Sequence, residues 1–99
     1  MLPRDIEFEW SSTKAASNLK KHGVSFDEAE TAFDDEFAYI FDDEGHSDEE
    51  PREILIGYSM TNRLMYVSFI QRASDQIRII SARMADRRER ISYEENSRF

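Results

Sequence analysis

The chain has 99 residues, of which 39% are hydrophobic and 12% aromatic, and its formal net charge is −8 at neutral pH. A chain of this length can bury one hydrophobic core, so we expect a single domain over residues 1–99. It has no cysteine, which excludes disulfides and thiolate metal sites, and no apolar run long enough for a signal peptide or membrane span, so we expect a cytoplasmic protein.

The amino-terminal region predicts a strand followed by a helix. Residues 6–10 alternate apolar and acidic side chains, a period of two that is typical of a strand with one buried face. Ser11 or Ser12 can cap a helix over residues 12–22, and Gly23 stands where a left-handed residue would end it.

A second helix follows almost at once. Ser25 and Glu28 have the spacing of a capping box, and Val24 and Phe26 are expected to pin the turn between the helices into the core. Residues 38–41 predict a short strand, and the polar stretch 42–51 that follows predicts a solvated loop.

Three strands are predicted over residues 53–60, 64–70 and 76–82, joined by connections of hairpin length. Asp86 and Glu89 then form a second capping-box pair, which predicts a carboxyl-terminal helix. Its apolar face is thin, so we expect it to be weakly docked or completed by another chain. The fold class is therefore α+β: an antiparallel sheet with two helices on one face and a short carboxyl-terminal helix, the other face being left for function.

Charge is distributed unevenly along the chain. Residues 27–53 contain 13 acidic residues and one base, Arg52, for a local charge of −12, whereas the remainder carries 8 acids and 12 bases. Affinity for nucleic acid comes from clustered bases, so the distribution matters more than the total.

One side of the first helix carries polar groups suited to phosphodiester chemistry. Lys14, Asn18 and Lys21 stand at i, i+4 and i+7, and His22 lies four residues after Asn18. His22 can transfer protons near neutral pH, as RNA cleavage requires, although the spacing alone favours a structural role at the helix end.

Seven arginines and three acids lie between Arg63 and Arg90, and arginine suits phosphate oxygens better than lysine does. Regular alternation along the last strand would put Arg83 on one face with Ser81, and Arg78 on the other. Taken singly, each arginine is more often a solvated surface charge than part of a site.

Other kinds of site find little support. His46 lies among carboxylates, but the segment fits no calcium-loop spacing, and an acidic loop is the better interpretation. Neither a glycine-flanked serine nor a glycine-rich phosphate loop is present.

Taken together, these motifs resemble the BrnT family of bacterial type II toxins over nearly the whole chain. The matching residues are Phe8-Glu9-Trp10, Lys14, Asn18, Lys21-His22-Gly23-Val24, Phe26, Glu28-Ala29, Phe33-Asp34-Asp35, Asp43, His46-Ser47, Glu50, Arg52, Ile56-Gly57, Arg78-Ile79-Ile80-Ser81-Ala82-Arg83, Glu89-Arg90 and Tyr93-Glu94.

The resemblance implies a RelE-like fold, ribonuclease activity, and neutralisation by a BrnA-like antitoxin with a ribbon-helix-helix domain. It points to His22, Arg63 and Arg83 as catalytic, His22 for proton transfer and the arginines for charge stabilisation. Lys14, Lys21 and Arg87 would bind the RNA backbone, with no metal and no cofactor.

Two other functions stay open. The chain could be a catalytically inactive module that binds a DNA-binding antitoxin and modulates its operator binding, or an acidic interaction domain unrelated to RNA. The acidic segment 27–53 either lies remote from the basic face, where it could meet a basic antitoxin, or marks a copy that has lost catalysis.

Overall fold

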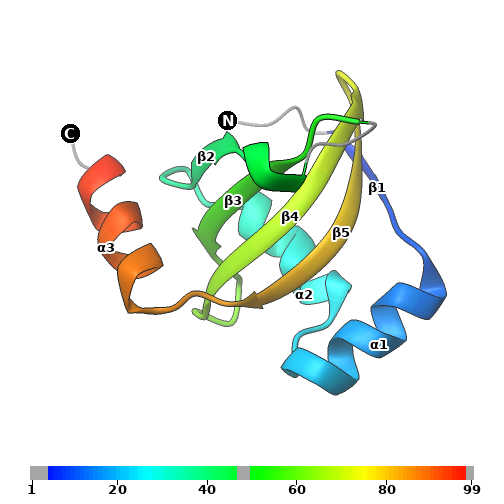
Figure 1. The fold of residues 1–99 in the computed structure, drawn as a ribbon, viewed down its shortest axis with the longest axis horizontal. Coiled ribbons are helices and arrows are strands. Elements are labelled where there is room, and N and C mark those ends of the chain that lie inside the picture. The colour runs from blue at the N-terminus through cyan, green and yellow to red at the C-terminus, as the bar shows by residue number, and fades with distance from the viewer. Residues whose placement is uncertain (1–4, 47–49, 98–99) are drawn as a thin grey trace.

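A computed structural model describes residues 5–46 and 50–97 of the chain. The elements lie in the predicted order (Figure 1). They are β1 (Glu7–Glu9), α1 (Ser12–His22), α2 (Phe26–Thr31), the short 3₁₀ turn η1 (Ala32–Asp34), β2 (Tyr39–Asp42), the 3₁₀ turn η2 (Glu44–His46), β3 (Glu53–Tyr58), β4 (Leu64–Ala73), β5 (Gln76–Met84) and α3 (Arg87–Asn96). Within the described ranges, no helix is long and apolar enough to cross a membrane.

The five strands form one sheet in the order β1-β5-β4-β3-β2. The meander β3-β4-β5 is antiparallel as predicted, and β2 also pairs antiparallel with β3. The prediction of an antiparallel sheet was wrong at one edge, because β1 runs parallel to β5 with Phe8 opposite Ile77. No short turn joins these two strands, so hairpin geometry does not fix their relative direction.

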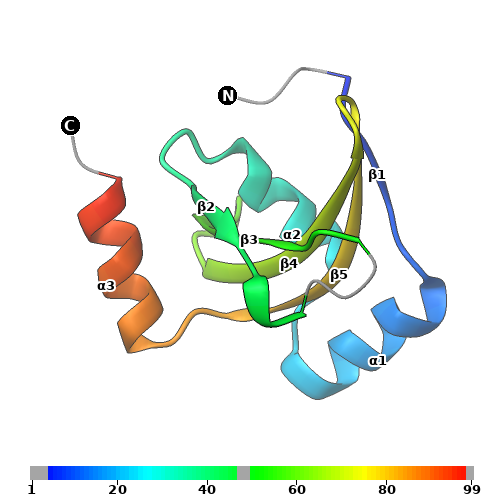
Figure 2. The ribbon, with the colours of Figure 1, turned by 45° about the horizontal axis from the view of Figure 1, so that its top comes forward.

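Helices α1 and α2 lie on the same side of the sheet, which we call the helix-covered face (Figures 1 and 2). Its core includes Val24 and Phe26, at 0% and 1% exposure, which pin the turn between the helices as predicted. Phe33 makes edge-to-face contacts with Phe8 and Phe69, each at 5.0 Å between ring centroids. Aromatic rings from β1, η1 and β4 therefore join the two layers.

The amino termini of the helices are capped close to prediction. The side chains of Ser11 and Ser25 accept hydrogen bonds from the backbone of Lys14 and Glu28, at 3.3 and 3.0 Å. In α3, Asp86 and Glu89 complete a reciprocal capping box. The box at Ser25 is only half formed, because the side chain of Glu28 turns to the β3–β4 connection instead.

Asn18 of α1 covers the edge of β5 beyond the point where β1 ends. Its amide nitrogen donates to the carbonyls of Ala82 and Val24 at 2.8 and 3.0 Å, and its amide oxygen accepts from the backbone N–H of Ala82 at 3.1 Å. One buried side chain therefore bonds both polar groups of a strand residue, as a neighbouring strand would.

A bulge in β5 changes which side chains share a face. Ser81 pairs with Ser68 and Ile79 with Phe69, so Ile80 is an extra residue without a partner. Ile79 and Ala82 consequently both enter the helix-covered core. The predicted separation of Arg78 from Arg83 was wrong, because the extra residue puts both on the opposite face, which we call the open face.

Helix α3 packs on the open face at its β2–β3 end, around Tyr93, which is 8% exposed. The hydroxyl of Tyr93 donates to Asp35 at 2.7 Å, and its ring meets Tyr58 edge-to-face at 5.4 Å. The same Asp35 oxygen accepts the backbone N–H of Tyr58 at 2.8 Å. The apolar face of α3 is thin as expected, and these contacts around Tyr93 join the helix to the sheet. That another chain completes its apolar face stays a prediction.

Candidate functional site

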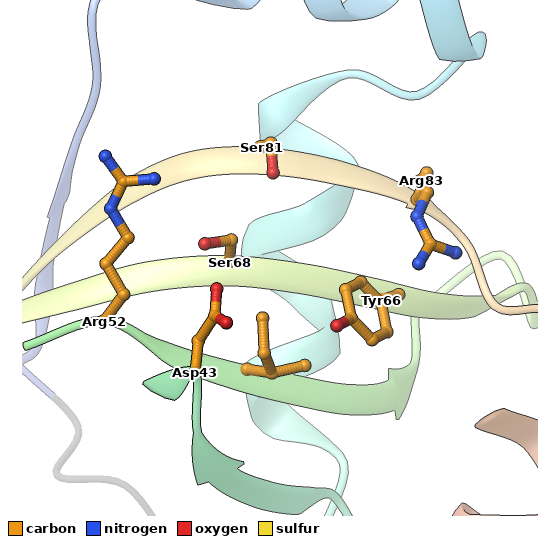
Figure 3. Close-up of a pocket in the computed structure, with 7 residues that line it drawn as sticks. Asp43, Arg52, Tyr66, Ser68, Ser81 and Arg83 are labelled. Atoms are coloured by element: carbon orange, nitrogen blue, oxygen red, sulfur yellow. The ribbon is translucent and has the colours of Figure 1, made fainter. Parts of the chain in front are cut away.

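The open face carries a cavity of about 310 Å³ that α3 leaves uncovered (Figure 3). Its residues come from β3, β4, β5 and the connection between β2 and β3. They are Asp43, Arg52, Ile54, Tyr66, Ser68, Ser81 and Arg83.

The register between β4 and β5 determines which side chains form the floor of this cavity. Ser68 on β4 lies opposite Ser81 on β5, and Tyr66 lies opposite Arg83. Side chains two residues apart point to the same face, so each strand supplies two neighbouring polar groups. Without the bulge at Ile80, residues Ser81 and Arg83 would share a face with Ile79 and face the helices.

Arg83 is held in a defined orientation at one end of the cavity. Its guanidinium carbon lies 4.0 Å from the centroid of the Tyr66 ring. The two terminal nitrogens donate to Glu89 at 2.9 and 2.8 Å, and one also donates to the Met84 carbonyl at 3.2 Å. The hydrogen bonds to Glu89 raise the pKa of Arg83, so the group stays charged.

Tyr66 is a hydrogen-bond donor under ordinary conditions. Burial, assisted by the charge of Glu89, raises the pKa of its phenol above the usual value. The phenol is therefore protonated near neutral pH, and its ring offers a flat apolar surface beside two serine hydroxyls.

Arg52 lies at the end of the cavity opposite Arg83, with Ser68 and Ser81 between them (Figure 3). Asp43 joins the same wall, and its backbone N–H donates to the carbonyl of Arg52 at 2.9 Å. Both residues belong to the acidic segment 27–53. The suggestion that this segment lies remote from the basic face was therefore wrong for its Asp43 and Arg52 part.

Arg63 occupies a different place, at the corner where α1 meets α2. Its Nε donates to Glu28 at 2.8 Å, and its Nη2 bonds the other Glu28 oxygen and the Gly23 carbonyl, the latter at 3.3 Å. Ser59 and Thr61 also donate to Glu28, at 2.8 and 2.6 Å. The bonds from Arg63 above all, against the effect of burial, lower the pKa of Glu28 to about 2.

The other predicted site residues lie on α1 and α3. His22 is the last residue of α1, half-buried, and precedes the glycine whose carbonyl Arg63 bonds. Lys14 and Lys21 are exposed one turn to either side of Asn18, and Arg87 is exposed at the start of α3. The structure therefore groups His22 with Arg63 at the α1–α2 corner and places Arg83 in the cavity, which neither of them lines.

The sequence left most of the cavity unassigned. Arg52 stood out only as a lone base among acids and as one residue of the family resemblance, and Tyr66 was not assigned to a site. Ser68 carried a usable signal in the sequence, because it interrupts the apolar run from Val67 to Ile70. In the structure its side chain is only 6% exposed. Burying a hydroxyl group costs free energy unless it is hydrogen-bonded, so a serine within an apolar strand is a candidate site residue.

Arg52 and Arg83 give the cavity the chemistry of an anion site. Two guanidinium groups at its ends and hydroxyl groups along its floor can bind the oxygens of a phosphate. Tyr66 can add its phenol as a donor, because Arg83 already lies over its ring. Among the described residues, no group of three or more histidine, aspartate or glutamate side chains is placed to hold a metal ion. The loop considered for metal lies partly outside this range, at residues 47–49.

Comparisons with known proteins give a matching family model and a solved structure of similar fold. The family model described as "Ribonuclease toxin, BrnT, of type II toxin-antitoxin system" matches residues 10–89. The crystal structure of the ribonuclease toxin BrnT from Brucella abortus is similar in fold, with a TM-score of 0.63 and 24% sequence identity over 83% of this chain and 99% of that one. No curated protein matches this chain.

Proposed function

Because this chain belongs to the BrnT family of ribonuclease toxins of type II toxin-antitoxin systems, we propose that it cleaves RNA and binds the reacting phosphate in the open-face cavity. The observation that carries this proposal is the placement of Arg52 and Arg83 at the two ends of a hydroxyl-lined floor. Phosphoryl transfer concentrates negative charge on the phosphate oxygens in the transition state, and fixed cations stabilise that charge most effectively when water is partly excluded.

The proposed reaction uses no metal. The 2′-hydroxyl of the substrate attacks the neighbouring phosphorus, a bond from O2′ to phosphorus forms, and the bond to the leaving O5′ breaks. A base takes the proton of the 2′-hydroxyl, and an acid gives one to O5′. The products are a 2′,3′-cyclic phosphate and a 5′-hydroxyl, and a DNA strand resists cleavage because it has no 2′-hydroxyl.

Arg83 stabilises the phosphate charge, and Tyr66 can donate to a phosphate oxygen. We retain His22 as the proposed proton-transfer residue. Because it does not line the cavity, the reacting phosphate would have to lie at the Arg83 end, where β5 passes the α1–α2 corner, with Lys14 and Lys21 guiding the RNA backbone along α1 beside the β5 edge that Asn18 covers. Arg87, at the start of α3, would bind the backbone beyond Arg83. A strand of RNA would then cross from the α1 corner over the edge of β5 into the cavity.

Arg63 receives a revised role in this proposal. Its guanidinium is committed to Glu28 and the Gly23 carbonyl, so it holds the Lys21-His22-Gly23 corner against the β3–β4 connection. We infer that it positions His22 instead of touching the phosphate.

The partner is proposed to be a BrnA-like antitoxin with a ribbon-helix-helix domain, as the family suggests. The acidic segment 27–53 would contribute to its binding through long-range attraction, and the association rate should then fall steeply as salt is raised. Equal association rates at low and high salt would show that the acidic segment does not contribute to antitoxin binding.

A second function is favoured by one observation: Arg83 and Arg63 each already bond a carboxylate in the free chain. A chain whose arginines serve only its own structure would be a catalytically inactive module that binds the antitoxin and modulates its operator binding. Tight complex formation with intact RNA would identify that function.

The deciding experiment is growth after induced expression, with total RNA examined alongside, for wild type, His22→Ala and Arg83→Ala at matched soluble levels. Lys20→Ala serves as the control, because Lys20 is exposed on α1 beside Lys21 and has no role in the proposal. We expect wild type and the control to arrest growth and fragment RNA, and the two site variants to do neither. Harmless wild type with intact RNA would support the inactive module.

A further inference from the structure

Glu89, the third residue of α3, is the side chain that fixes Arg83. Its two carboxylate oxygens receive the two terminal nitrogens of Arg83 at 2.9 and 2.8 Å. The same carboxylate accepts the backbone N–H of Asp86 at 2.8 Å, which completes the capping box. The Glu89 side chain is 18% exposed, against 37% for Arg83, so the carboxylate is the better shielded member of the pair.

The position of Glu89 is set by contacts that α3 makes one turn further along, with the β2–β3 end of the sheet. Tyr93, one helical turn after Glu89, bonds Asp35, and Arg90 donates to the Tyr58 hydroxyl at 3.0 Å. Asp35 is itself fixed by the backbone N–H groups of Phe37 and Tyr58, at 2.9 and 2.8 Å. The carboxylate thus stands on a helix anchored to the β2–β3 end of the sheet.

The bonds of Arg83 leave one side of its guanidinium available. Arginine has five N–H donors. Its contacts within the described chain use Nη1 for Glu89 and the Met84 carbonyl, and Nη2 once for Glu89. The donors that remain are Nε–H and the second Nη2–H, which lie side by side and match two oxygens of one phosphate.

We propose that Glu89 is a positioning residue for Arg83: it grips one pair of guanidinium donors so that the adjacent pair faces the cavity over Tyr66. This inference rests on the proposed function for its catalytic consequence. The advantage is preorganisation, since a guanidinium already oriented does not have to be ordered when charge develops on the phosphate. Glu89 also lowers the positive charge near the RNA, so it aids the chemical step at some expense of binding.

The test compares wild type, Glu89→Gln, Arg83→Ala, the double variant and Asp86→Ala. Glu89→Gln keeps the size of the side chain and an oxygen for the Asp86 N–H, but it removes the charge that holds Arg83. Asp86→Ala removes the other half of the capping box, and the charge of Asp86 is the smallest of the influences that raise the pKa of Arg83, so this variant controls for loosening of the helix end. Cleavage is measured on a single-stranded RNA, and binding on the same strand with deoxyribose at the cleaved position.

We expect Glu89→Gln to lower kcat about tenfold or more, because a misplaced catalytic group is costly. Its Kd for the deoxy-substituted strand should be unchanged or tighter, because a negative charge near the RNA is gone. Asp86→Ala should lower Tm and leave kcat near that of wild type. The double variant should cleave no more slowly than Arg83→Ala, because Glu89 acts through Arg83.

The Nη–H signals of Arg83 in ¹⁵N-labelled protein test the positioning without reference to cleavage, because Glu89 accepts hydrogen bonds from both Nη groups. These hydrogens should exchange with solvent slowly in wild type and faster in Glu89→Gln. Equal exchange in both, a kcat for Glu89→Gln at or above wild type, or a further loss in the double variant would overturn the proposal. Intact RNA with wild type would refute the ribonuclease function alone, and the exchange rates would still decide whether Glu89 orients Arg83.

Discussion

The helix-covered face and the open face come from the same strands and differ in what covers them. Alternate residues of β3 are Leu55, packed against the helices, and Ile54 and Ile56, which face the other way toward α3 and the cavity. Two helices close one face completely, whereas α3 covers only one end of the other. Side chains beyond α3 are therefore free to be polar, so the larger hydrophobic core and the proposed phosphate site lie on opposite sides of one sheet.

The largest expected effect comes from the helix-covered face. Phe26→Ala should lower the free energy of unfolding by about 3–5 kcal/mol, since it leaves a cavity in a closed core. Phe26 is 1% exposed and meets Trp10 edge-to-face at 5.8 Å. Urea unfolding measures the loss, with Met60→Ala as control, because Met60 is 81% exposed. A comparable loss for the control would mean that burial does not explain the difference.

A substitution in the cavity should lower activity strongly and the free energy of unfolding only slightly, the opposite of Phe26→Ala. Arg52→Ala removes a charged donor worth about 1.5–3 kcal/mol to a bound phosphate, which corresponds to about 10- to 100-fold in kcat/KM for RNA cleavage. Unfolding by urea should change far less than for Phe26→Ala. If Arg52→Ala unfolded the protein without a specific loss of activity in the folded fraction, the two faces would not be separated as described.

Asn18 lies at the β5 edge of the sheet, between the helix-covered face and the open face. Its substitution therefore tests how much the closed edge contributes to stability. Asn18→Leu keeps the volume of the side chain but leaves the Ala82 N–H and two buried carbonyls without partners. We expect a loss of about 1–3 kcal/mol in the free energy of unfolding. Ser17→Ala, at an exposed position of the same helix, should have little effect. Hydrogen exchange at Ala82 should accelerate in Asn18→Leu only.

The last expected effect is a pH dependence at the α1–α2 corner, which appears only as the pH becomes acidic. The pKa of Glu28 falls from 4.5 to about 2 in the folded chain, chiefly through its hydrogen bond from Arg63. A lowered carboxyl pKa stabilises the fold above pH 4.5, and this contribution is lost as pH falls toward 2. Unfolding free energies measured from pH 6 to 2 should therefore decline less for Glu28→Gln than for wild type. Parallel curves would show that the pair is not coupled to folding.

Local signals in the sequence were enough to predict the order of the elements. Ser25, Gly23 and Asp86 mark helix ends through contacts with residues a few positions away, and such contacts can be found from spacing. The hairpins from β3 to β5 follow from short connections in the same way. Glycine at position 23 adopts a φ of 69°, the left-handed conformation that its place after the helix suggested.

The features that spacing could not predict depend on distant partners. The parallel pairing of β1 joins residues with no turn between them. The bulge at Ile80 cannot be located from the pattern, because Ile77 and Ile79 share a parity with Ser81 whereas Ile80 and Ala82 share the other with Arg78, so both parities mix apolar and polar residues. The cavity likewise assembles Arg52, Ser68 and Arg83 from three separate strands or connections. The predicted grouping of His22, Arg63 and Arg83 followed chain motifs, and the structure divides that group between two places.

The pairing of β1 with β5 also limits when the sheet can be completed during synthesis of the chain. Glu9 bonds Arg78, 69 positions later, so the sheet edge cannot close until most of the chain has left the ribosome. Contacts of such long sequence separation form late in folding because the intervening loop must first be closed. Ser81, Arg83 and Glu89 emerge later still. A nascent chain therefore has no complete cavity before these residues have emerged, and any nuclease activity must await their emergence from the ribosome.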